Sequence, residues 1–314
     1  MSRIVISGAS GDLGRRVTRL LLNEDPDAEL TLVTRTPENL ADRTGPGIAI
    51  MKGDYRDRES LDAAYSGADT LFLISGLNLG RRVSEHRNAI DAAVRAGIRH
   101  IVYTSVGGGG LPNNPALSAK DHYRSEQDLQ SSGIAYTILR NHLYAEIVSK
   151  IWVTPAVESG RLEMATGEGF LSPVAKGDVA RSAAAVLRAP ARHGGAIYEI
   201  TGPELLSMRD IVRIGSEVHG VQIEYRPVTA EERLAHFDSI GIPRTYDPGM
   251  PPSAEGHMWA SDELVSADLA AAEGFQAILT HQVKQITGRE PEPLRAVMER
   301  VKSVRYDQID DDAA

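Results

Sequence analysis

The stretch that decides the fold is Gly8-Ala9-Ser10-Gly11-Asp12-Leu13-Gly14. It follows a short apolar run, Ile4-Val5-Ile6, and opens a segment whose apolar residues repeat at helical spacing: Leu13, Val17, Leu20 and Leu21. A glycine pattern is informative only in this setting, between a strand and a helix. In that setting it predicts the phosphate-binding turn of a dinucleotide-binding fold, and chance glycines in an ordinary strand–turn–helix are the alternative.

Each glycine of this turn has a separate physical task. Gly8 permits a tight turn, Gly11 lets the backbone approach a pyrophosphate, and Gly14 lets the helix pack closely on the strand. The start of the helix then faces the anion with free N–H groups and its positive dipole end. We therefore expect the whole turn to bind the cofactor, through Gly8, Ser10, Gly11, Asp12, Leu13 and Gly14.

The alternation of strand-like and helix-like segments predicts the architecture. Nearly all-apolar runs, typical of strands buried on both faces, recur up to about residue 140: Leu30 to Val33, Ile48 to Met51, Thr70 to Ile74, Ile98 to Thr104 and Tyr136 to Leu139. Amphipathic segments such as Val83 to Ala96 lie between them. This order predicts an α/β protein with a Rossmann doubly wound parallel sheet.

The rhythm changes after about residue 140, where prolines and aromatic residues become frequent and strands such as Ile197 to Thr201 and Val221 to Tyr225 stand alone. We expect residues 1–140 to form the dinucleotide-binding domain. Residues 141–306 should form a smaller α+β substrate lobe, interleaved with the first domain. A long loop, a candidate lid, is predicted over residues 241–256, and residues 307–314 read as a disordered acidic tail.

Composition narrows the classes of function. The 314 residues include no cysteine, which excludes disulfides, thiolate metal sites and a cysteine nucleophile, and the nine histidines show no metal-ligand spacing. The net charge of −9 comes without a basic block, so we expect no nucleic-acid partner. With no secretory signal pattern and no long apolar run, the sequence predicts a cytoplasmic protein that does not bind a membrane, either a monomer or a homodimer.

The residue after the second strand points to the form of the cofactor. An NAD enzyme usually places Asp or Glu there to bind the ribose 2′-hydroxyl, whereas this chain reads Thr34-Arg35-Thr36. A guanidinium can bind a 2′-phosphate bidentately, and a carboxylate would repel it. Arg35 therefore predicts NADP(H), with a plain loop arginine in water as the alternative.

Taken together, these motifs resemble the NmrA-like group of atypical short-chain dehydrogenases/reductases, nearest its quinone oxidoreductase type 2 and triphenylmethane reductase branch. The resemblance covers most of the chain and rests on the glycine turn, Arg35 and the following segments: Gly53 to Tyr55, Leu73 to Ser75, Tyr103 to Ser105 and Tyr136 to Asn141. Weaker matches follow at Asp178 to Ala180, Tyr198 to Pro203 and Thr287 to Arg289.

The resemblance implies roles for residues that follow successive strands. Asp54 and Tyr55 are expected at the adenine, and Ser75 and Gly76 at the ribose and pyrophosphate. Thr104 counts with the cofactor residues, and Ser105 and Asn141 are expected at the nicotinamide. A helix cap for Asp54 and a plain strand-end hydroxyl for Ser105 are the alternatives. All these positions fall at carboxyl ends of strands, where open α/β sheets bind ligands.

The usual Tyr-x-x-x-Lys dyad of short-chain dehydrogenases is absent from the helix after the fifth strand. In our register, Ser118 and His122 stand where tyrosine and lysine would be, and Glu126 follows on the same helical face. The resemblance implies that His122, where related reductases carry lysine, supplies a proton, with Glu126 orienting it or supporting its protonated form. A solvent-facing histidine on a polar helix is the alternative.

Candidate substrate walls are mostly aromatic or methionine side chains that suit a flat, conjugated molecule: Tyr144, Trp152, Met164, Phe170, Tyr246, Met250 and Trp259, together with Asn141. Each is an equally good core residue. The leading hypothesis is an NADPH-dependent reductase of a quinone, ketone or other conjugated acceptor. A non-catalytic NAD(P)-binding redox sensor of the NmrA type is the main alternative, and a lyase, isomerase or epimerase with a resident nicotinamide is the third.

Overall fold

The computed structural model describes residues 2–245 and 260–304, and its centre is a seven-stranded parallel sheet. The strands lie in the order β3-β2-β1-β4-β5-β6-β9, which is the strand order of a Rossmann fold with one strand added at the β6 edge. Their bounds are β1 (Ile4–Ser7), β2 (Leu30–Thr34), β3 (Ile48–Lys52), β4 (Thr70–Leu73), β5 (His100–Val106), β6 (Ala135–Asn141) and β9 (Ala196–Ile200). The predicted fold class is confirmed.

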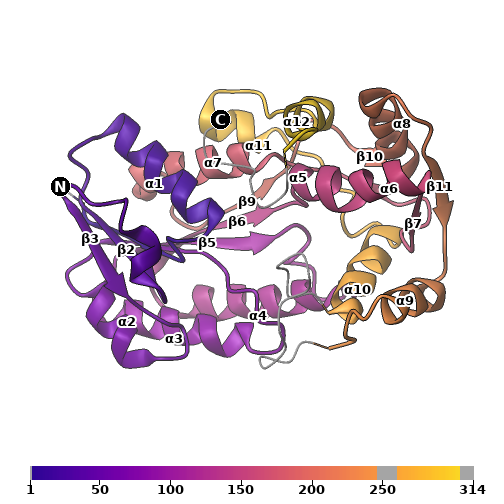
Figure 1. Ribbon diagram of the computed structural model, residues 1–314. Coiled ribbons are helices and arrows are strands. Elements are labelled where there is room, and N and C mark those ends of the chain that lie inside the picture. The colour runs from indigo at the N-terminus through magenta and orange to yellow at the C-terminus, as the bar shows by residue number, and fades with distance from the viewer. Residues whose placement is uncertain (1, 246–259, 305–314) are drawn as a thin grey trace.

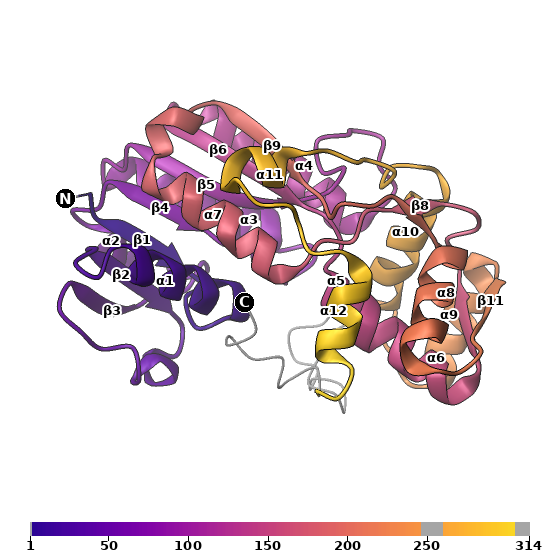
Figure 2. The same ribbon diagram turned by 90° about the horizontal axis from the view of Figure 1, so that it is seen from above.

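Helices cover both faces of the sheet, as Figures 1 and 2 show. One face carries α1 (Asp12–Glu24), α7 (Lys176–Arg188) and α11 (Gln282–Thr287), whose apolar side chains pack with those of β1, β2 and β6 in one core cluster. The other face carries α2 (Arg58–Tyr65), α3 (Arg82–Arg95) and α4 (Leu117–Ser131), with a core cluster of their own. Short 3₁₀ helices, η1 (Pro37–Leu40) and η3 (Pro190–His193), follow β2 and α7.

A second lobe is built from the C-terminal half around a separate core. Its strands pair in twos: β7 (Arg161–Met164) runs parallel to β11 (Glu224–Pro227), and β8 (Phe170–Leu171) runs antiparallel to β10 (Leu206–Ser207). Its helical elements are α5 (Ala145–Ile147), the π-helical segment η2 (Val148–Val153), α6 (Thr154–Ser159), α8 (Met208–His219), α9 (Ala230–Ser239), α10 (Ser261–Ala272) and α12 (Leu294–Val301).

The chain beyond residue 141 does not stay in this lobe. It returns to the sheet with α7, which packs on α1, and with β9, which pairs with β6. The strand expected over Val221 to Tyr225 begins at Glu224, because the preceding residues follow the left-handed Gly220 that ends α8. Most of the loop predicted over 241–256, and the tail 307–314, lie outside the described residues.

The second lobe meets the sheet where β5 and β6 end. Gly108, just after β5, lies against the backbone carbonyl of Phe275, and the Leu117 N–H at the start of α4 donates to the Ser266 hydroxyl of α10 at 3.0 Å. The carboxyl edge of the sheet is therefore enclosed between α4 and the second lobe. No helix among the described residues is long and apolar enough to span a membrane.

Candidate functional site

The glycine turn between β1 and α1 has the geometry that its sequence predicts. Gly8 adopts a left-handed conformation, with φ of +76°, and its N–H donates to the Val33 carbonyl of β2. A Cβ on Gly14 would lie 2.6 Å from the Gly8 carbonyl oxygen, so helix and turn approach each other too closely for any side chain. A Cβ on Gly11 would meet only the same oxygen at 3.4 Å, so Gly11 borders open space.

The first turn of α1 can accept an anion although Asp12 places a carboxylate in it. Gly11 caps the helix without a side-chain hydrogen bond, which leaves the first N–H groups free of a side-chain partner. The Asp12 carboxylate pairs with Arg16 at 2.5 Å and with Lys176 of α7 at 2.6 Å. Burial opposes its charge, but both cations outweigh burial and lower the pKa of Asp12. Its repulsion of a pyrophosphate is thereby offset, and Lys176 is a contributor that sequence spacing did not reveal.

The end of β2 presents Arg35 on the surface. Ser10 of the glycine turn and Thr34 of β2 hydrogen-bond through their hydroxyls at 2.7 Å, and Arg35 follows with an exposed side chain. Nearby, the Arg56 guanidinium binds Asp54 with distances down to 2.5 Å, and this hydrogen bonding lowers the pKa of Asp54, with a smaller contribution from the charge of Arg35. The edge where an adenosine 2′-phosphate is expected thus presents the exposed guanidinium of Arg35. The Asp54 carboxylate beside it has its charge balanced by Arg56.

Tyr55 and Ser75 also form hydrogen bonds that connect strand ends at this edge. The Tyr55 hydroxyl lies 2.7 Å from the Ile74 carbonyl and 2.5 Å from the Ser7 hydroxyl, so it ties the ends of β1 and β4 together. Its hydroxyl is therefore committed to the protein, and only the ring is left for an adenine. After β4, the Ser75 N–H donates to the Thr104 hydroxyl at 2.9 Å, which gives Thr104 a structural task beside the one expected.

The loop after β4 is held by two residues that the sequence did not single out. The Gly76 N–H donates to Nε2 of His86 at 3.0 Å, and Nε of Arg82 donates to the Gly76 carbonyl at 2.8 Å. Arg82 also lies 3.4 Å from the Asp121 carboxylate of α4. Both side chains are buried, and their hydrogen bonds hold in place the loop that is expected to line the ribose.

A directed chain of hydrogen bonds leads from this loop to His122. Because Nε2 of His86 accepts the Gly76 N–H, its Nδ1 carries the proton, which reaches Ser125 at 3.0 Å or the Tyr103 oxygen at 3.2 Å. The Tyr103 hydroxyl lies 2.6 Å from Nδ1 of His122, and it donates to that nitrogen when the proton of the ring is on Nε2. This assignment leaves Nε2–H as the only donor of a neutral His122 ring.

The structure corrects three expectations about His122. The ring is buried, with 2% exposure, so it is not a solvent-facing surface histidine. Burial, and after it the positive charge of Arg82, lowers the pKa of His122 well below its usual 6.5. Burial therefore disfavours a protonated His122 near neutral pH. The expected partner Glu126 is also wrong, since its carboxylate accepts instead from Ser105 at 2.6 Å and from Arg140 at 2.6 Å.

Ser105 and Asn141 close the carboxyl edge at β5 and β6. Ser105 is buried and donates to Glu126, whereas the side-chain oxygen of Asn141 is buried and has no hydrogen-bond partner among the described residues. A buried acceptor without a partner is costly unless a ligand supplies the donor. The carboxamide of a nicotinamide carries such a donor, so Asn141 fits the group that the sequence predicts there.

The candidate substrate walls do not share one surface. Tyr144 packs against the core under α1 and α7, while Trp152 and Met164 belong to the core of the second lobe. Phe170 is 43% exposed in β8. Tyr246, Met250 and Trp259 lie outside the described residues.

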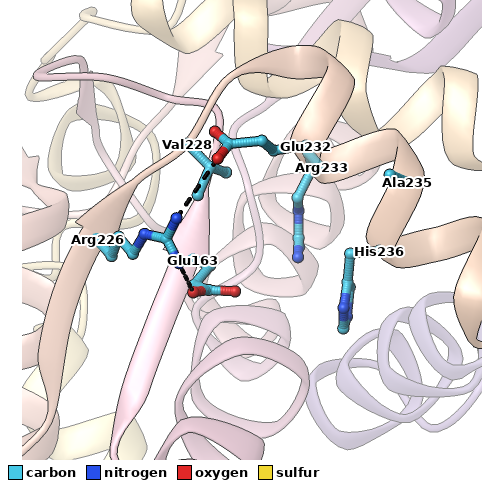
Figure 3. A pocket seen from close by; sticks show the side chains of 7 residues that line it. All are labelled: Glu163, Arg226, Val228, Glu232, Arg233, Ala235 and His236. Atoms are coloured by element: carbon cyan, nitrogen blue, oxygen red, sulfur yellow. Dashed lines mark hydrogen bonds and ion pairs between the residues drawn. The ribbon is translucent and has the colours of Figure 1, made fainter.

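A cavity of about 380 Å³ lies within the second lobe between β7, β11 and α9. Figure 3 shows Arg226 placed between Glu163 and Glu232, with Arg233 and His236 projecting from α9 beside them. None of its lining residues comes from the sheet edge described above. The cavity is therefore not the place where a nicotinamide would meet its substrate.

Comparison with known proteins agrees with this geometry. A family model described as NAD(P)H-binding matches residues 8–190. Quinone oxidoreductase 2 of Escherichia coli is 32% identical over 76% of this chain and 82% of its own length. The crystal structure of an NADPH-dependent quinone oxidoreductase from the same organism, complexed with NADPH, has a TM-score of 0.84 at 28% identity and covers 96% of this chain and 100% of that one.

A third similarity concerns the triphenylmethane reductase of Citrobacter sp., whose crystal structure is a complex with NADP(H). Its TM-score is 0.82 at 26% identity, over 95% of this chain and 99% of that one. The chain belongs to the NAD(P)H-binding family, in its NmrA-like group. It is an NAD(P)H-dependent oxidoreductase, as the sequence predicted.

Proposed function

We propose that the protein reduces a conjugated small-molecule acceptor, of which quinones are the best candidates, with NADPH preferred over NADH. The preference for NADPH is supported by Arg35 directly after β2, the position where NAD enzymes usually carry the carboxylate that binds a ribose hydroxyl. NADPH, when bound, supplies a hydride from its nicotinamide. Residues of this chain would bind and orient it: the glycine turn would hold the pyrophosphate, Arg35 the 2′-phosphate, and Asn141 the carboxamide.

The observation that carries the choice of acceptor is the neutral, buried His122. A neutral imidazole carries one N–H, which can donate a hydrogen bond but is a far weaker acid than the N–H of an imidazolium. A ketone becomes a strongly basic alkoxide and needs an early proton, whereas a quinone gives a stabilised phenolate. A site whose donor is a neutral imidazole therefore suits quinones and similar conjugated acceptors better than simple ketones.

Cofactor choice is tested by titrating NADPH and NADH into the parent protein, Arg35→Ala and Arg95→Ala. Arg95 is a similarly exposed arginine paired with Asp62 at 2.6 Å on the α2–α3 face, and it serves as the matched control. We expect the parent and Arg95→Ala to favour NADPH, and Arg35→Ala to lose most of that preference, about 1.5–3 kcal/mol for a hydrogen bond to a charged group. Equal affinities of the parent for both cofactors would refute the assignment of Arg35.

The acceptor is tested by following NADPH oxidation with quinones, aryl ketones and enones. Turnover should be fastest with quinones and slow with ketones throughout the neutral pH range. Faster reduction of ketones would contradict the argument from His122. Tight NADPH binding without turnover of any acceptor would favour the sensor hypothesis instead.

A further inference from the structure

A buried chain of polar side chains starts at Ser105 and crosses the carboxyl edge of the sheet. The Ser105 hydroxyl donates to Glu126 at 2.6 Å, and Arg140 binds both oxygens of that carboxylate at 3.0 and 2.6 Å. Arg140 reaches Glu199 of β9 at 3.1 Å, and Glu199 lies 3.0 Å from the ring of His142. One hydroxyl at the nicotinamide end is thus linked to charged groups on α4, β6 and β9.

The glycine run after β5 lies directly over this chain. A Cβ on Gly109 would lie 2.9 Å from the Ser105 hydroxyl, and one on Gly110 would lie 1.8 Å from Nη2 of Arg140. A Cβ on Gly107 would lie 2.8 Å from the ring of His142. Four consecutive glycines, Gly107 to Gly110, therefore let the backbone shield the charges without a side chain displacing them.

The far end of the chain is a brace rather than a second catalytic site. His142 stands between Glu199 and Ser172, each 3.0 Å away, which is the order of a hydrolase triad. Ser172 and His142 are both buried, however, and the ring lies beneath Gly107. These contacts hold Glu199 against Arg140.

The direction of the Ser105 hydrogen bond follows from its neighbours. Burial opposes the charge of Arg140, but its bonds to Glu126 and Glu199 prevail and raise the pKa of Arg140, which therefore stays a cation. A carboxylate that receives two N–H groups from a cation offers Ser105 only acceptor lone pairs. The Ser105 proton points to Glu126, and the Ser105 oxygen turns its remaining lone pairs away from it.

We propose that Glu126 is a positioning residue that acts through Ser105 and makes the nicotinamide end of the site a hydrogen-bond acceptor. This inference rests on the proposed function and on the expectation, implied by the family resemblance, that the nicotinamide lies beside Ser105. A hydroxyl that donates to a carboxylate gains electron density on its oxygen, because linked hydrogen bonds polarise one another. Such an acceptor favours the oxidised, positively charged nicotinamide over the reduced, neutral one. The pair thereby lowers the cost of giving up the hydride.

The test measures affinity and needs no substrate. The dissociation constants of NADP⁺ and NADPH are determined by calorimetry for the parent, Ser105→Ala, Glu126→Gln and the double variant. Asp178→Asn is the matched control, because Asp178 is a buried carboxylate paired with Arg181 at 2.6 Å and has no contact with Ser105. We expect Glu126→Gln to weaken NADP⁺ about tenfold and NADPH much less, the size of a hydrogen bond to a charged group exchanged for a neutral one.

The double variant decides whether Glu126 works through Ser105. If it does, Glu126→Gln in the Ser105→Ala background changes the NADP⁺ affinity little further, and Asp178→Asn leaves both affinities at the parent values. Additive losses, or equal weakening of both cofactor forms, overturn the inference. Ser105→Ala keeps it testable if Glu126→Gln folds poorly, since equal weakening of both forms in that variant refutes it as well. Parent-like binding of both forms by Ser105→Ala would instead remove Ser105 from the nicotinamide site and count against the proposed function.

Discussion

Replacing Gly14 by alanine should cost stability and binding together. The new Cβ would lie 2.6 Å from the Gly8 carbonyl oxygen and 2.7 Å from Cα of Ala9, and both are backbone atoms that no change of rotamer can move away. Overpacking of this kind costs about 1–3 kcal/mol, and the better helix propensity of alanine returns up to about 1 kcal/mol. We expect a net loss of about 1–2 kcal/mol in the free energy of unfolding and a weaker NADPH complex, because the turn itself must shift.

Gly11→Ala separates the two effects and serves as the comparison. Gly11 has φ of −77° and ψ of 165°, which alanine adopts readily, and its Cβ would meet only the Gly8 oxygen at 3.4 Å. Stability should change by less than about 1 kcal/mol, while NADPH binding falls by more than tenfold because the methyl group occupies the approach to the pyrophosphate. Urea unfolding and calorimetry measure the two quantities. Parent-like stability of Gly14→Ala, or parent-like binding by Gly11→Ala, would refute this account of the turn.

Three further outcomes follow from other parts of the structure. Burial holds the pKa of His122 well below 6.5, so the plots of rate against pH for the parent and His122→Gln should have the same shape between pH 6 and 8. An inflection near pH 6.5 in the parent that is absent from the variant would contradict this. Burial raises the pKa of Asp268 from 3.8 to about 6, so its folded state binds more protons, and stability should fall by up to about 3 kcal/mol as pH rises through that range. In Asp268→Asn, urea unfolding at pH 4 and 7 should lack this component, and an unchanged pH dependence would argue against it. Gly110→Ala should push the Arg140 guanidinium off Glu126 and weaken NADP⁺ more than NADPH in titrations, whereas equal weakening would mean that Arg140 does not support Glu126.

The sheet and its glycine turn were predictable because their determinants are local. Strands buried on both faces are mostly apolar, so runs such as Leu30 to Val33 and Thr70 to Ile74 were recognisable without knowledge of their neighbours. The turn follows from three glycines within seven residues: Gly8 has a left-handed conformation, Gly14 is in a close approach inside the same strand–turn–helix unit, and Gly11 borders open space. Tertiary structure had nothing to override at these positions, and the predicted bounds differ from the observed ones by one or two residues.

The partners of the polar residues at the sheet edge were not predictable in the same way. Spacing placed His122 and Glu126 on one face of α4 and suggested that they form a pair. The structure shows that neighbours on a helix face can serve different partners, since His122 hydrogen-bonds with Tyr103 of β5 while Glu126 binds Ser105 and Arg140. Those partners lie 14 to 21 residues away in sequence. The pairing of β5 with β6 sets Ser105 beside Arg140 and so brings both to the Glu126 carboxylate.

One sequence feature did carry information about this network. Gly107 to Gly110 follow the strand that ends with Ser105 and Val106, and four glycines at a strand end indicate that the backbone approaches something closely. The structure identifies three of those approaches as the Ser105 hydroxyl, the Arg140 guanidinium and the His142 ring. In this protein the glycine run lies over polar and charged side chains, because a side chain at Gly109 or Gly110 would displace the Ser105 hydroxyl or the Arg140 guanidinium. The glycines and Glu126 therefore act together to fix the direction of the Ser105 proton.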